Sequence, residues 1–165
     1  EGLLYRLRVG CPWRDLPKTF GRWNSVFQAF NRWSSNNKLM KIFKSLVQDP
    51  DTEWEFMDGS FVKAHQHSHG AATDEDEAIG KSCGGNNTKI HMVVDSFGLP
   101  IEFVLTGGQV HDSQIAPVLI GLTPASDYMI ADRGYHSGVI RDAIRHRGSI
   151  PVIPRKKNSI VGNDV

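Results

Sequence analysis

Two aspartates stand where a carboxylate could take part in catalysis. Asp58 lies in EWEFMDGSFV, a stretch whose alternation of residue types predicts a β-strand. Trp54, Phe56 and Asp58 fall on one side of this strand, and the pattern predicts that side to be the buried or cleft face. Asp132 ends YMIAD, a continuous apolar run typical of a strand buried on both faces. A charged group on a buried face is costly unless a partner satisfies it.

The two carboxylates converge if their strands are neighbours, since ligands bind at the carboxyl edge of open sheets. Two adjacent acids repel unless one is protonated or a divalent cation lies between them. Oxygen ligands without thiolates favour Mg²⁺, with Mn²⁺ as a substitute, over zinc, and such a site suits phosphodiester chemistry. A structural alternative stays open, in which Asp58 pairs with Lys63 or Lys89. Asp132 then only caps a turn.

The chain around these acids divides into a helical part and an α/β part. Apolar residues recur at helical spacing in EGLLYRLRVG, in RWNSVFQAFNRW and again over residues 39–47, which predicts a small helical domain over residues 1–50. Residues 51–165 predict, in order, a strand, a hairpin, a helix with Asp112 as N-cap, a strand, a helix and a strand. This order is typical of a mixed α/β sheet with antiparallel strands leading into parallel βαβ units. The polar, glycine-rich residues 65–88 predict a long loop.

Charge is unevenly distributed, although the net charge is only +1. Residues 1–48 hold nine basic residues and two acidic ones, whereas residues 49–111 hold three basic and eleven acidic ones. A polyanion-binding part beside a cation-binding part explains this asymmetry, and so does a solvated helix face beside an acidic loop. Two distant cysteines and the lack of an apolar run of about 18 residues predict a cytoplasmic protein with neither disulfides nor a membrane span.

Four stretches of the chain share their order and spacing with a known family. They are GCPWRDLP with FGRWNSVFQAFNRW, MDGSFVKAHQHSHGA, DEAIGKSCGGNNTKIHMVVDSFGLPIEFVLTGGQVHD, and ADRGYHS. Together they resemble bacterial insertion-sequence transposases of the four/five superfamily over nearly the whole chain. The resemblance implies a ribonuclease-H-like catalytic domain with an Asp-Asp-Glu triad after a small helical domain. It further implies metal-dependent cleavage of DNA at element ends, and strand transfer.

The resemblance also implies a cofactor, partners and site residues. By motif, Asp58 of MDGS is the first catalytic acid and metal ligand, and Asp132 of ADRGY is the second. Mg²⁺ is the implied cofactor, with Mn²⁺ as its substitute. The implied partners are terminal repeats and target DNA, bound by a nucleoid-associated homodimer in the full-length protein. The third acid, a glutamate on a later helix, has no counterpart, so the chain is expected to be truncated before it.

Several basic residues are candidates for contacts with the DNA backbone, because each neutralised phosphate adds affinity. They are Lys81, Lys89, Arg133, Arg155, Lys156 and Lys157. Inert surface loops and a solvated basic tail explain the same residues equally well.

A zinc site is a competing interpretation of the histidine-rich stretch. His65, His67 and His69 alternate, with Cys83 and His91 further along, but no zinc-ligand spacing accompanies them. The segment KSCGGNNTK lacks the full phosphate-loop pattern, so we predict no organic cofactor.

Two other functions stay open. One is a non-catalytic DNA-binding transposase remnant, and the other is a metal hydrolase acting on a small phosphoester. His111 and Asp112 could form a general base with its orienting partner, although helix capping by Asp112 explains the pair more simply.

We predict that this chain alone does not cleave DNA, because two of three acidic ligands should bind metal weakly and in poor geometry. The measurement is nicking of a supercoiled plasmid in the presence of Mn²⁺. Robust nicking that Asp58→Ala abolishes would contradict the prediction.

Overall fold

A computed structural model describes residues 1–47, 49–64, 78–82 and 85–155. The chain divides into two compact units, Glu1–Gln48 and Asp49–Val165. Within the described residues, no helix is both long and apolar enough to cross a membrane.

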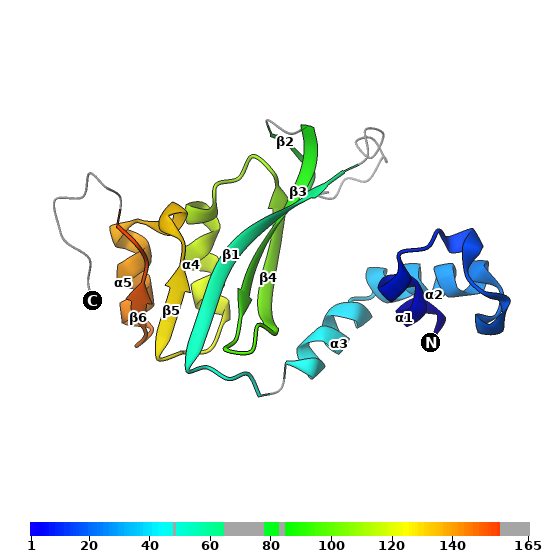
Figure 1. Ribbon diagram of the computed structural model, residues 1–165, viewed down its shortest axis with the longest axis horizontal. Helices are drawn as coiled ribbons and strands as arrows, with labels where there is room; N and C mark the ends of the chain where they lie inside the picture. The colour runs from blue at the N-terminus through cyan, green and yellow to red at the C-terminus, as the bar shows by residue number, and fades with distance from the viewer. Residues whose placement is uncertain (48, 65–77, 83–84, 156–165) are drawn as a thin grey trace. The chain divides into compact units, whose positions relative to one another are not determined.

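The first unit is helical and is held together mainly by aromatic side chains. It contains α1 (Gly2–Val9), α2 (Trp23–Ser35) and α3 (Lys38–Leu46), with short 3-10 turns between α1 and α2 (Figure 1). The ring of Trp13 lies 5.3 Å from the ring centres of both Phe27 and Phe30. The helical spacing of apolar residues therefore predicted the right elements, and their aromatic members pack within the unit.

The second unit is built on one mixed six-stranded sheet (Figure 1). Its strands are β1 (Trp54–Lys63), β2 (Gly80–Ser82), β3 (Gly85–Val94), β4 (Pro100–Gly107), β5 (Tyr128–Ala131) and β6 (Ile150–Val152). The order is β2-β3-β1-β5-β6, and β4 pairs with β3. Pairing is antiparallel between β1, β3 and β4 and parallel from β1 through β5 to β6. The predicted mixed α/β arrangement is confirmed.

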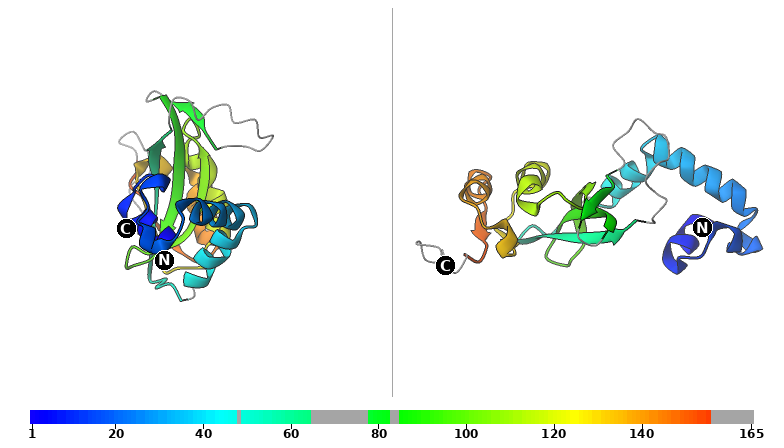
Figure 2. Two further views of the ribbon diagram at one scale, coloured as in Figure 1. Left: turned by 90° about the vertical axis from the view of Figure 1, so that its right-hand side faces the viewer. Right: turned by 90° about the horizontal axis from the view of Figure 1, so that it is seen from above.

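Among the described residues of the second unit, the helices cover one face of this sheet (Figure 2). The helices α4 (Asp112–Leu122) and α5 (Gly138–His146) pack side by side on it, as the view from above shows (Figure 2). Met57, Val93 and Met129 point from the strands into the core beneath the helices and are almost completely buried. The opposite face is more open and carries large exposed apolar side chains on its strands: Trp54, Phe56, Tyr128, Ile150 and Val152.

The predicted loop over residues 65–88 is partly wrong. Residues 80–82 and 85–88 belong to β2 and β3, while residues 65–77 and 83–84 lie outside the described residues. The pairing of β1 with β3 extends as far as Lys63 and Asn87, so neighbouring strands satisfy the backbone of this polar segment. Such pairing overrides the weak strand preference of glycine and asparagine.

The predicted orientation of β1 is also wrong. Trp54 and Phe56 are 41% and 39% exposed, whereas Glu55 and Met57 face the helices and are 0% and 2% exposed. The buried carboxylate of this strand is therefore Glu55, and Asp58 lies on the opposite, open face.

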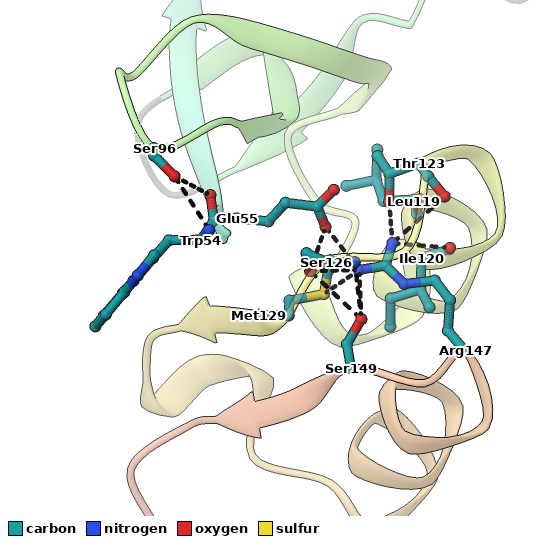
Figure 3. Close-up of polar contacts among 10 residues, drawn as sticks. All are labelled: Trp54, Glu55, Ser96, Leu119, Ile120, Thr123, Ser126, Met129, Arg147 and Ser149. Atoms are coloured by element: carbon teal, nitrogen blue, oxygen red, sulfur yellow. Dashed lines mark hydrogen bonds and ion pairs between the residues drawn. The ribbon is translucent and has the colours of Figure 1, made fainter. Parts of the chain in front are cut away.

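Glu55 is buried because Arg147 reaches it from the end of α5 (Figure 3). Arg147 Nη2 donates to Glu55 Oε2 over 2.6 Å, and Ser126 Oγ donates to the same oxygen over 3.2 Å. The other guanidinium nitrogen, Nη1, donates to the Ile120 carbonyl over 3.3 Å and to the Thr123 hydroxyl. Burial raises the pKa of the Glu55 carboxyl, and Arg147 opposes that rise. This cluster joins β1 to the segments that end α4 and α5.

We predict that Arg147→Met lowers the free energy of unfolding by about 3–5 kcal/mol, because it leaves the Glu55 carboxylate buried without a counter-charge. The measurement is equilibrium urea denaturation. The matched control is Arg145→Met, which removes an exposed pair with Asp142 and should cost less than about 1 kcal/mol. Equal losses in the two variants would contradict the prediction.

Candidate functional site

The parallel register of β1 and β5 brings the two predicted acids together. Met57 pairs with Ala131 in the last pair of this ladder, and the next residues are Asp58 and Asp132. Asp132 keeps an extended backbone, with φ −74° and ψ 178°. Neighbouring parallel strands lie about 4.8 Å apart, and side chains at matching positions point to the same face. The two carboxylates therefore lie side by side on the open face, where β5 ends.

Each of these carboxylates has one oxygen engaged by the backbone. Asp58 Oδ1 accepts from the Gly59 amide over 2.7 Å, and Asp132 Oδ1 accepts from the Gly134 amide over 2.8 Å. Both side chains are exposed, and within the described residues neither forms an ion pair with lysine or arginine. Asp132 thus caps a turn, as the structural alternative expects, yet one oxygen of each acid stays available.

The pair of free oxygens fits a hard divalent cation only in part. Carboxylate oxygens are ligands that Mg²⁺ and Mn²⁺ prefer. Among the described residues, however, no three side chains of histidine, cysteine, aspartate or glutamate are grouped so that they could hold an ion. A cation at Asp58 and Asp132 would therefore need further oxygen ligands from water, from a substrate or from other residues.

Asp112 forms a second, half-buried cluster close to Gly59, the neighbour of Asp58. Its Oδ2 lies 2.5 Å from Lys89 Nζ, and its Oδ1 lies 3.1 Å from His91 Nδ1. The hydroxyl of Tyr135 donates to the same Oδ1 over 3.3 Å. This single carboxylate therefore joins α4 to β3 and to the turn that follows Asp132.

The burial of His91 favours a neutral ring. His91 Nε2 lies 2.8 Å from Thr106 Oγ1, whose hydroxyl also donates to the Gly107 carbonyl over 3.2 Å, and Nδ1 lies 3.1 Å from Asp112 Oδ1. Burial lowers the pKa of His91, although the negative charge of Asp112 opposes this. For Asp112, burial raises the pKa, but Lys89, His91 and the Tyr135 hydroxyl together lower it below its usual value. The cluster is therefore built on a lysine–carboxylate ion pair, beside a histidine whose burial favours the neutral ring.

Tyr135 is hydrogen-bonded to one carboxylate, that of Asp112, and is influenced electrostatically by two others. It is 1% exposed, and burial raises the pKa of its hydroxyl. The negative charges of Asp112, Asp58 and Asp132 raise that pKa further. The phenol is thus a neutral hydrogen-bond donor at all physiological pH values, and it lies within electrostatic range of Asp58 and Asp132.

The structure does not support two roles considered for Asp112. The N-cap of α4 is His111, whose Nδ1 accepts from the Ser113 amide over 3.3 Å, and not Asp112 as predicted. The Asp112 carboxylate binds Lys89 and His91 in place of the His111 ring. His111 and Asp112 are therefore not arranged as a base and its orienting partner.

The predicted DNA contacts differ in their placement. Lys81 on β2 and Arg133 beside Asp132 are exposed, and Arg155 is half-buried. The Lys89 side chain is 7% exposed and bound to Asp112, which argues against its contact with a DNA backbone. The remaining candidates, Lys156 and Lys157, lie outside the described residues.

The zinc interpretation gains nothing from the described part of the chain. Its residues His65, His67, His69 and Cys83 lie outside the described residues. His91 is completely buried and uses its ring nitrogens on Asp112 and Thr106, so it is not free to bind a metal.

Sequence reasoning missed Tyr135 and Gly59 as members of this site. Both stand close to an acid in the sequence, in ADRGY and MDGS, and this proximity was the available signal. Their roles depend on Asp112, which comes from a distant helix, so no local pattern could reveal them.

A basic groove lies in the helical unit. It measures about 740 Å³ and is lined by Arg14, Lys18 and Arg22, with Trp23 as an aromatic wall and Asp15 as its acidic member. The three basic side chains are exposed, and none of them has an ion pair within the described residues. The groove therefore combines positive charge with a flat apolar surface.

Two protein families match the chain. Residues 56–164 match the family described as the transposase DDE domain, and residues 1–43 match a family described as a putative transposase of the IS4/5 family.

Curated relatives match a smaller part of the chain. The uncharacterized protein y4sN of Sinorhizobium fredii is 37% identical over 71 residues, which are 43% of this chain and 57% of the relative. The putative transposase for insertion sequence element IS402 of Burkholderia cepacia is 35% identical over 81 residues, 42% of this chain and 38% of the relative. The chain thus spans less than two thirds of either relative.

A solved transposase structure resembles the fold. In the piggyBac transposase synaptic complex with hairpin DNA, the similar region covers 88% of this chain and 32% of that chain, with a TM-score of 0.51 and 11% sequence identity. This likeness concerns the fold alone and agrees with the ribonuclease-H-like arrangement expected for the mixed sheet.

Proposed function

The chain belongs to the IS4/5 family of DDE transposases, and on that premise we propose that Asp58 and Asp132 are two acidic ligands of a metal centre for DNA cleavage and strand transfer. The observation that carries this proposal is the parallel register that ends at Met57 and Ala131, since it places both acids on one face. Their free oxygens and exposure support the same assignment.

The residues at this centre have different proposed roles. Asp58 and Asp132 would hold Mg²⁺, or Mn²⁺ in its place, through the oxygens that the backbone leaves free. A bound divalent ion supplies activation of the attacking water or 3′-hydroxyl and stabilisation of the leaving oxygen. Arg133, exposed directly after Asp132, is placed to attract a phosphate. Gly134 keeps the adjacent backbone free of a side chain.

DNA is the proposed substrate and partner. The solved neighbour contains hairpin DNA, and this chain carries nine basic residues within residues 1–48. We place one phosphate-backbone contact in the basic groove of Arg14, Lys18 and Arg22. Terminal repeats as the bound sequence, a homodimer and a location on the nucleoid are proposals for the whole protein, and they follow from the family resemblance alone.

We predict that this chain binds Mn²⁺ at the two acids and that Asp58→Asn or Asp132→Asn weakens the binding by on the order of tenfold or more, because ligand charge sets the affinity for hard cations. The measurement is titration of free Mn²⁺ by electron paramagnetic resonance. The control is Asp142→Asn, which removes an exposed acid on α5 and should leave the affinity unchanged. Identical titrations for all four proteins would refute the metal centre.

We predict that the groove variant R14A/K18A/R22A weakens binding to duplex DNA at least about tenfold and reduces the slope of log affinity against log salt by roughly 2 to 3, since each phosphate contact contributes about 0.9. The measurement is fluorescence anisotropy at several salt concentrations. The control R8A/R32A/K41A makes the same change in charge on exposed residues of the helical unit outside the groove. An equal loss in both variants would mean that overall charge, and not the groove, binds DNA.

A second candidate function is a DNA-binding protein without catalysis. The observation that favours it is the lack of a third acid grouped with Asp58 and Asp132 among the described residues. Under this alternative, Asp58→Asn and Asp132→Asn still bind DNA. Mn²⁺ then has no effect on the DNA binding of either variant or of the parent chain.

A further inference from the structure

We infer that Asp112 is a positioning residue for the proposed metal centre: it fixes the backbone beside Asp58 and the turn after Asp132 from the helix-covered side of the sheet. This inference rests on the proposed function, because it concerns the same two acids. Asp112 would not itself hold the ion but would act through Gly59, Tyr135 and Lys89.

The first connection is a close approach to β1. A Cβ atom at Gly59 would lie 2.3 Å from Asp112 Oδ1 and 3.0 Å from Lys89 Cε, so any other residue at this position would displace the carboxylate. Gly59 also donates its amide to Asp58 Oδ1 over 2.7 Å. The backbone unit that orients the first acid is therefore packed against Asp112.

The second connection passes through Tyr135. Its hydroxyl donates to Asp112 Oδ1 over 3.3 Å, and its amide donates to the Asp132 carbonyl over 3.2 Å. Because the ring is fully buried, the tyrosine cannot change its orientation without breaking the local packing. The turn that carries the second acid is thus tied to the same carboxylate oxygen.

The third connection sets the position of Asp112 itself. Lys89 and His91 on β3 bind its two oxygens, over 2.5 Å and 3.1 Å. The same strand pairs with β1, where Met92 lies opposite Asp58. Residues of β3 therefore hold Asp112, and Asp112 in turn packs against β1, the strand that pairs with β3. In this way β1, β3 and the turn after β5 all contact the Asp112 side chain.

Asp112 also controls the local charge. Lys89 is buried beside the Gly59 backbone, and Asp112 is the carboxylate that it binds. Without that carboxylate, the Lys89 ammonium would keep the Phe61 ring, 4.7 Å away, but no acidic partner among the described residues, and its positive charge would remain close to the proposed cation site. Loss of the negative charge of Asp112 should therefore lower the ion affinity, and loss of its contacts with Gly59, Tyr135 and Lys89 should lower it as well.

Two substitutions test the inference without a large change in volume. Asp112→Asn keeps the size and one acceptor oxygen but removes the charge, and Tyr135→Phe removes only the hydroxyl. We expect the dissociation constant for Mn²⁺ to rise about tenfold in Asp112→Asn and a few-fold, roughly threefold, in Tyr135→Phe, within the range typical of residues that orient metal ligands.

The matched control is Ser126→Ala. Ser126 also contributes a buried hydroxyl near one end of β5, but its hydroxyl bonds Glu55, at the end of the strand away from Asp132. This variant should lower the urea midpoint while the Mn²⁺ affinity of the folded protein stays unchanged. It separates a loss of stability from a loss of positioning.

Mn²⁺ titrations are run on the full chain under conditions where circular dichroism shows every variant to be folded. Lower affinity in Asp112→Asn and Tyr135→Phe, with parental affinity in Ser126→Ala, supports the inference. Parental affinity in all three variants overturns it and leaves the metal centre intact. If the parent chain and Asp58→Asn give the same Mn²⁺ titration, the proposed function is overturned, and the inference with it.

Discussion

The parallel pairing of β1 with β5 is the constraint on which the site depends. Met57 opposite Ala131 sets a register in which Asp58 and Asp132 follow as equivalent positions. Because side chains alternate along a strand, a slip of one residue would move one acid to the helix-covered face and leave the other on the open face. The register is protected by burial, since Met57 and Ala131 belong to the core on the covered side.

The two faces of β1 carry carboxylates in opposite environments, one buried and one exposed. On the covered face, Glu55 has lost its water and is compensated by Arg147 and Ser126. On the open face, Asp58 keeps its exposure and one free oxygen. The strand β1 is thus held on its covered face by a buried ion pair, and on its open face it carries an acid without an ion-pair partner among the described residues. The fold that this ion pair stabilises keeps Asp58 and Asp132 together although their charges repel each other.

Sequence patterns predicted the elements better than the contacts. The helices and the mixed sheet follow from local periodicity, and the motifs MDGS and ADRGY contain the two aspartates that the register of β1 and β5 brings together. The facing of β1 could not be predicted, because Arg147, the residue that makes Glu55 a buried position, lies 92 residues away in the chain. Lys89 was taken for a surface residue for the same reason, since Asp112 lies 23 residues further on. Polar pairs between residues far apart in the chain can bury charged side chains, so an expectation that apolar residues are buried and polar ones exposed fails at Glu55 and Lys89.

The open face has a thermodynamic consequence for ion binding. Trp54, Phe56 and Tyr128 are exposed on the same side as the two acids, so an element that covered the whole of this side would remove water from both the rings and the carboxylates. Less water strengthens the attraction between carboxylate and cation, and it makes the bare acids more costly. For an ion held by the two acids, covering this face and binding the ion would be coupled, and each would raise the equilibrium constant of the other by the same factor.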